Sequence, residues 1–207
     1  MYLVSSPLAQ SRFLKPDSGL PLFERLMARY FFLPVKARQT TWEQSNRFFE
    51  RETEKILRLV QSLTLHQMQT PVLIARIQGI ENSSRFWSPA MVLEHLMIVA
   101  PGMAEIILKL SQGVSPEVAV DISATKPKPS GDLSSESLKA LLENFASSME
   151  QVRERVTQEV RNRNSRSKLS HPWFGPLSAR EWNWLLATHQ RIHRRQIEEI
   201  QKHYLGR

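Results

Sequence analysis

Two histidines near the end of the sequence are spaced so that both imidazoles could bind one metal ion. His189 and His193 lie four residues apart in LLATHQRIHRRQIEEI, a segment with helical periodicity. Residues with this spacing lie about 5–6 Å apart at Cβ on one face of an α-helix, and zinc–nitrogen bonds of about 2.0–2.1 Å fit that geometry. An HxxxH pair alone is a weak signal, since most such pairs are partly buried or surface histidines without a ligand.

Two further features favour a metal site. The pair lies on the apolar stripe of its helix, and the outward face is expected to carry Arg191, Arg194, Arg195, Glu198 and Lys202. His95 interrupts the apolar stripe of a different helix. Histidines from facing helices can build a metal site inside a bundle, and three neutral imidazoles leave positions open for water or substrate, as a catalytic site requires. The sequence therefore predicts His95, His189 and His193 as metal ligands.

The other histidines fit this site less well. His171, in the HPWFGP loop, could lie over the site as an extra ligand or a hydrogen-bond donor, but a structural role in the loop is the favoured interpretation. His203 is ten residues beyond His193, about 15 Å along a helix axis, and is too far away to join it. His66 has no informative context and is predicted to be a surface residue.

Four long helices must position these histidines. Thr41 and Gln44 form a predicted capping box for the first, and Ser88 followed by a proline starts the second. The third is expected over 135–162, and the fourth begins with a second capping box, Ser178 and Glu181, and runs to about residue 203. Residues 113–133 are expected to be a long crossover loop, VLIARIQGI an extended segment, and RNRNSRSKLS a polar loop.

The organisation predicted from these elements is an N-terminal extension, 1–40, followed by one bundle domain, 41–207. In the extension, apolar residues recur at helical spacing from Leu22 to Phe31, and this short helix is predicted to end at Pro34. Packing on the bundle as an accessory helix is favoured over a role at a membrane surface.

The composition is that of a helical globular protein. The chain has 207 residues, 41% of them hydrophobic and 23% charged, with seven glycines. The absence of cysteine excludes disulfides, thiolate ligands and a cysteine nucleophile, and it fits a cytoplasmic protein. We expect neither a signal peptide nor a membrane span, because no basic start precedes an apolar run and no stretch approaches eighteen apolar residues.

The charge is strongly basic and unevenly distributed. Seven of the eight net positive charges lie in residues 151–207. Such a surface could attract nucleic acid or an anionic membrane. No helix-turn-helix, zinc-finger or RNP-type signature accompanies it, so a solvated basic face without specific nucleic-acid binding is favoured.

Two blocks carry a family resemblance. FWSPAMVLEHL (Phe86–Leu96) and HPWFGPLSAREWNWLLATHQRIHRRQIEEI (His171–Ile200) resemble the DinB-like (DinB/YfiT-type) superfamily, in the branch with an HPxFG loop before the last helix. The resemblance anchors roughly residues 70–203. It implies an all-α, up-down-down-up four-helix bundle, a histidine triad holding a divalent metal ion, usually zinc or nickel, and often a homodimer. Characterised relatives include thiol-dependent S-transferases and isomerases that use mycothiol or bacillithiol.

Two functional hypotheses follow. In the first the protein is a metalloenzyme, either a thiol-dependent S-transferase using a low-molecular-weight thiol or a metal-assisted hydrolase of a small molecule. No general acid or base is identifiable, since Glu94 should point away from the neighbouring ligand His95. In the alternative the protein is a non-catalytic, stress-related binding or interaction protein, whose triad is structural or empty. An ion with an open position beside a pocket would favour the enzyme.

Overall fold

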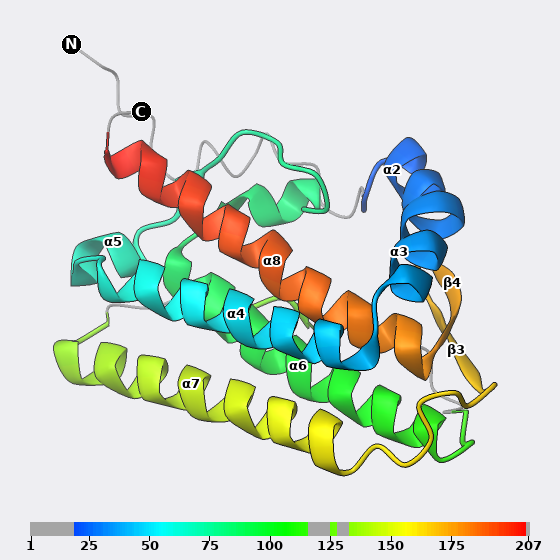
Figure 1. Ribbon diagram of the computed structural model, residues 1–207. Coiled ribbons are helices and arrows are strands. Elements are labelled where there is room, and N and C mark those ends of the chain that lie inside the picture. The colour runs from blue at the N-terminus through cyan, green and yellow to red at the C-terminus, as the bar shows by residue number, and fades with distance from the viewer. Residues whose placement is uncertain (1–18, 116–124, 128–132, 206–207) are drawn as a thin grey trace.

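Four long helices form a bundle in the computed structural model, which describes residues 19–115, 125–127 and 133–205 (Figure 1). They are α4 (Trp42–Gln61), α6 (Pro89–Ser111), α7 (Ser135–Gln158) and α8 (Ala179–Tyr204). α8 packs against α4 and α6, and α7 packs against the same two helices from the other side. Figure 1 shows that α4 and α8 run in one direction and α6 and α7 in the other. The predicted up-down-down-up bundle is therefore confirmed.

The helices begin where the sequence predicts, because local hydrogen bonds satisfy their first N–H groups. The Thr41 hydroxyl accepts from the N–H of Gln44 at 3.1 Å, and the Gln44 side-chain oxygen accepts from the N–H of Thr41 at 2.7 Å. Ser178 and Glu181 form the second capping box, and the Ser88 hydroxyl caps α6. The third helix ends a few residues earlier than predicted, at Gln158 rather than at residue 162.

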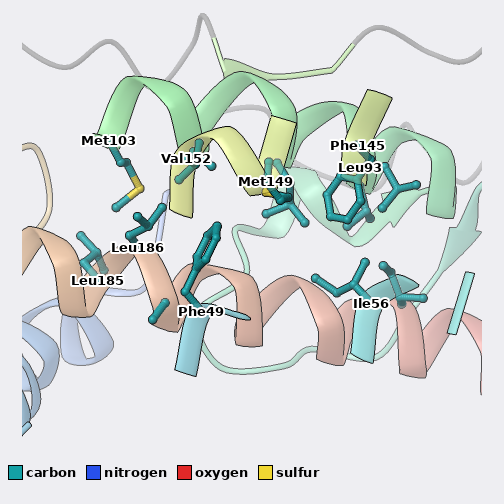
Figure 2. Close-up of a cluster of buried hydrophobic side chains, with 14 of the residues drawn as sticks. Phe49, Ile56, Leu93, Met103, Phe145, Met149, Val152, Leu185 and Leu186 are labelled. Atoms are coloured by element: carbon teal, nitrogen blue, oxygen red, sulfur yellow. The ribbon is translucent and has the colours of Figure 1, made fainter. Parts of the chain in front are cut away.

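The core lies between the inward faces of the four helices. Ile56 of α4, Leu93 of α6, Phe145 of α7 and Ile200 of α8 have no exposed surface. Figure 2 shows Phe145 among side chains of the facing helices. Burying one such side chain contributes about 1.5–3 kcal/mol, so the long apolar stripes are what hold the bundle together.

α6 is unusually apolar. Within the described residues it is the one helix that is long and apolar enough to cross a membrane by length and composition alone. Charged residues interrupt its apolar run, which is why the sequence predicts no membrane span. Of its most apolar window, 56% is buried inside the bundle. Packing against both α7 and α8 accounts for this composition.

The segment before α4 differs from the prediction. Helix α2 (Leu22–Met27), a π-helical turn η1 (Ala28–Phe32) and α3 (Leu33–Gln39) follow one another directly. The predicted end at Pro34 is wrong, because the proline occupies the first turn of α3, where a missing N–H is tolerated. α3 packs against α8 with Leu33 and Ala37 buried. Residues 1–18 of the predicted extension lie outside the described part of the chain.

Short strands precede two of the long helices. β1 (Val72–Leu73) pairs with β2 (Phe86–Trp87), so the extended segment expected there is two residues long. β3 (Lys168–His171) and β4 (Gly175–Ser178) form an antiparallel hairpin, where the sequence predicted only loops. The remaining elements, α5 (Leu65–Gln69) and η2 (Asn82–Arg85), connect α4 to β2. The hairpin ends at the residue that caps α8, so its turn is fixed relative to that helix. Much of the expected crossover loop lies outside the described residues.

A buried ion pair joins α4 to α8. The Glu52 side chain is 4% exposed and that of Arg194 15%, although arginine at this position was expected on the outward face. Glu52 accepts hydrogen bonds from the Arg194 guanidinium and from Lys55 Nζ, the latter at 2.8 Å. Burial acts to raise the pKa of Glu52, but the hydrogen bonds from Lys55 and Arg194 outweigh it and lower that pKa. The pair therefore stays charged inside the helix interface.

Replacing Glu52 with alanine should destabilise the fold by about 3–5 kcal/mol, because Arg194 would remain buried without its main partner. Urea denaturation measures this loss. The matched control is Glu54→Ala on the same helix, where the carboxylate pairs with Arg58 at the surface and should contribute less than about 1 kcal/mol. Equal losses in the two variants would contradict a structural role for the buried pair.

Candidate metal centre

The three predicted histidines converge between α6 and α8. His95 comes from α6, and His189 and His193 come from successive turns of α8. The Nε2 atom of His189 lies 3.3 Å from that of His95 and 3.2 Å from that of His193. His95 and His193 are buried and His189 is half-buried. The predicted convergence of the ring nitrogens on one point is confirmed.

The ring of His95 is oriented by the chain that follows α6. Its Nδ1 lies 2.7 Å from the backbone carbonyl oxygen of Thr125. A carbonyl oxygen can only accept, so Nδ1 carries the proton and donates it. The Nε2 lone pair is thereby directed at the other two histidines.

A second relay orients His193. Its Nδ1 lies 2.7 Å from Gln196 Oε1, and Gln196 Nε2 donates to the Ser84 carbonyl oxygen at 2.7 Å. The bond to Ser84 fixes which way the amide faces, so His193 Nδ1 is the donor and its Nε2 is free of a proton. Such outer hydrogen bonds set the tautomer of metal-binding histidines. Sequence reasoning gave no sign of the contact between Gln196 and Ser84.

The hydrogen bonds at the Nδ1 atoms direct the Nε2 lone pairs of His95 and His193 toward His189 Nε2, in a buried space of low dielectric constant. Burial lowers the pKa of His95. Burial first, and then the neighbouring histidines, hold the pKa of His189 and of His193 well below 6.5. The three rings are therefore neutral at neutral pH. The donor set fits a divalent cation, because two nitrogens about 2.0–2.1 Å from a tetrahedral zinc ion lie about 3.4 Å apart.

The three histidines line a cavity of ≈ 140 Å³. Most of its wall is apolar, and its aromatic residues are Trp87, Trp173, Phe174 and Trp182. The Trp87 ring stacks on His193, with centroids 6.1 Å apart and planes 8° apart. Packing on one side and the hydrogen bond to Gln196 on the other hold this imidazole in place.

His171 lines the same cavity from the turn of the β3–β4 hairpin. Its Nδ1 accepts from the N–H of Trp173 at 3.1 Å, and its ring stacks on Phe174 with centroids 4.5 Å apart. Burial lowers the pKa of His171 to about 4. The ring is therefore neutral with its proton on Nε2, and it is a hydrogen-bond donor. These contacts fit the favoured structural role in the loop, and His171 also lines the cavity.

The other candidate residues stay outside the group. His66 is exposed, as predicted, and His203, which was expected to lie too far away to join the site, is exposed as well. Glu94 does not belong to the cluster of nitrogen ligands, and burial raises its pKa. No described carboxylate joins the three histidines, so the candidate ligand set is three imidazoles.

Comparisons with known proteins identify the family. The family model of the DinB superfamily matches residues 48–197, and the chain belongs to that superfamily. The crystal structure of TT2238, a four-helix bundle protein, is similar with a TM-score of 0.51 and 22% sequence identity, over 76% of this chain and 98% of that one. At this identity the likeness concerns the fold. No curated protein matches the chain.

The low histidine pKa values predict how the stability of metal-free protein depends on pH. Below about pH 6.5 an unfolded chain protonates these histidines while the folded chain does not. Stability should be full above about pH 6.5 and fall below it by up to about 1.4 kcal/mol per pH unit for each histidine. The pKa of His171 extends the decline to about pH 4.

Urea midpoints of chelator-treated protein between pH 7.5 and 5 measure this decline. Replacing His193 with alanine should flatten it, and replacing the exposed His203 with alanine should leave it unchanged. A midpoint independent of pH in the wild type would contradict the burial of neutral imidazoles.

Proposed function

We propose that this protein is a metal-dependent enzyme in which His95, His189 and His193 bind one divalent cation, zinc or nickel. The separations of the Nε2 atoms carry the proposal, since 3.2 Å and 3.3 Å lie close to the spacing of ligands on a tetrahedral ion. The hydrogen bonds at the two Nδ1 atoms support it, because they leave the Nε2 lone pairs available.

The cavity beside the triad favours catalysis over a structural role. Structural zinc sites are closed by four protein ligands, and catalytic sites keep a position open. Here three histidines face a space of ≈ 140 Å³, similar to a cavity of about 150 Å³ that accommodates benzene in another protein. We therefore propose a small-molecule substrate with an apolar part, and we rank the non-catalytic alternative second.

We propose tasks for the bound ion, for His171 and for the aromatic residues around the cavity. A bound divalent ion supplies Lewis acidity and lowers the pKa of a water molecule or thiol. The Nε2–H of His171 would donate to an oxygen or sulfur atom of the substrate. The aromatic wall around it would exclude bulk water. Transfer of a group to a low-molecular-weight thiol and hydrolysis are the two reaction classes we propose.

Elemental analysis of protein purified without a histidine tag should find about one zinc or nickel ion per chain. His193→Ala should abolish binding and keep the helical content, because the long apolar stripes remain. Added metal at a hundredfold excess over its dissociation constant should stabilise the wild type by about 2.7 kcal/mol, measured by melting with and without chelator. His203→Ala is the control and should bind like the wild type.

If the melting temperature of the wild type changes neither with chelator nor with added zinc or nickel, the metal site is refuted. Cobalt substitution separates the two functional hypotheses. An open position should bind added azide and change the visible spectrum, whereas a closed site would leave the spectrum unchanged and favour the non-catalytic alternative.

Replacing Gln196 with alanine should weaken metal binding about 10–100-fold without removing a ligand, because His193 loses the acceptor that fixes its tautomer. Competition with a chromophoric chelator measures the affinity. Gln201→Ala, five residues further along α8, is the matched control, since this side chain donates to the Ser62 hydroxyl and does not line the histidine cavity. An unchanged affinity in the Gln196 variant would show that the relay to Ser84 does not act on the metal.

A further inference from the structure

A second, larger cavity lies between α8 and the segment formed by α2, η1 and α3, which we call the accessory segment. Its volume is ≈ 500 Å³, within the range of about 300–1,000 Å³ typical of small-molecule sites. Phe32 and Leu33 line it from the accessory segment, Phe48 from α4, and Trp184 and Leu185 from α8. We call this cavity the α3–α8 groove.

The groove borders the histidine cavity. Five residues line both spaces: Leu20, Gly79, Phe174, Leu185 and Ile192. The wall between them is tight at Gly79, where an added Cβ would lie 2.9 Å from the Ile192 side chain. Gly79 therefore packs closely against Ile192 in the wall that the two spaces share.

Three exposed cations line the groove. Lys36 comes from α3, and Arg191 and Arg195 come from successive turns of α8. None of them forms an ion pair with another described residue, whereas Arg194 of the same helix pairs with Glu52 and Glu198. Like charges four residues apart on a helix repel each other, so an anion would relieve this arrangement.

The other polar groups of the groove also favour binding of an anion. Glu24, the carboxylate among its described lining residues, is neutralised by a hydrogen-bonded ion pair with Arg76. Thr188 also lines the groove, and its hydroxyl is buried and has no hydrogen-bond partner in the described part of the chain. The groove therefore combines an apolar floor, an unused hydroxyl and an uncompensated positive charge.

We infer that the α3–α8 groove binds a small amphiphilic molecule with an acidic group. The acid contacts Arg191, Arg195 and Lys36, and the apolar part lies along Phe32 and Trp184 toward the wall shared with the histidine cavity. The binding does not depend on the metal. We also infer that molecules of this class are the substrates of the metal centre, and this part of the inference rests on the proposed function.

Calorimetric titration with octanoate, 1-octanol and octylamine tests the inference. The protein is treated with chelator, so a carboxylate cannot bind through a metal ion. Octanoate should bind, and octanol and octylamine should bind at least about tenfold more weakly, because they lack the charge-assisted hydrogen bonds of a carboxylate.

The double variant Arg191→Gln/Arg195→Gln should weaken octanoate binding about tenfold or more. The matched control is Arg47→Gln/Arg51→Gln, which removes the same charge from another exposed pair four residues apart, on α4, that lines neither cavity. The control should bind octanoate like the wild type, and both variants should keep the metal content of the wild type.

Equal binding of octanoate and octanol, or an equal loss in the two double variants, would overturn the inference. A third result would also overturn it: the wild type binds no octanoate, and the sedimentation coefficient of the Arg191→Gln/Arg195→Gln variant differs from that of the wild type. The groove would then be an interface between copies of the chain. Octanoate binding in a protein that takes up no zinc or nickel would refute the proposed function alone.

Discussion

The packing of α8 between α4 and α6 is the interaction on which the rest of the structure depends. One face of α8 carries Ile197 and Ile200, which have no exposed surface, together with both of its cavity-lining imidazoles. The burial that stabilises the bundle therefore also brings His189 and His193 to His95. The ion pair between Glu52 and an α8 arginine fixes the other flank of this helix. A change in the tilt of α8 would disturb the core and the metal centre together.

The features that could be predicted from the sequence are local ones. Capping boxes act over three residues and helical faces repeat over seven, so the long helices and the inward position of each histidine follow from spacing. The family resemblance implied the bundle that brings the two helices together. Arg194 was misplaced because periodicity gives one buried face, whereas α8 has two neighbouring helices and buries a wider arc. The β3–β4 hairpin was missed because its strands are four residues long and one begins in a polar stretch. Its turn nevertheless brings His171 to the cavity.

The groups that orient the imidazoles could not be predicted, because they come from distant segments. Thr125 belongs to the chain after α6, and Ser84 belongs to the short helix before β2. Both act through backbone carbonyl groups, which every residue type possesses, so no side-chain pattern marks them. The chemistry of the site thus depends on backbone positions as much as on the histidines themselves.

The parallel pairing of α4 with α8 has a consequence for how the protein matures. The two ends of the Glu52–Arg194 bond are 142 residues apart in sequence, and His95 and His189 are 94 apart. During synthesis, α4, α6 and α7 leave the ribosome before the helix that completes their shared core. The group of three histidines is therefore incomplete until α8 has emerged, so the proposed binding of an ion would follow folding of the last helix. A nascent chain stalled before that point would present only His95 of the three histidines and would leave the buried apolar faces of α4, α6 and α7 uncovered, and such exposed apolar surface is a target for chaperones.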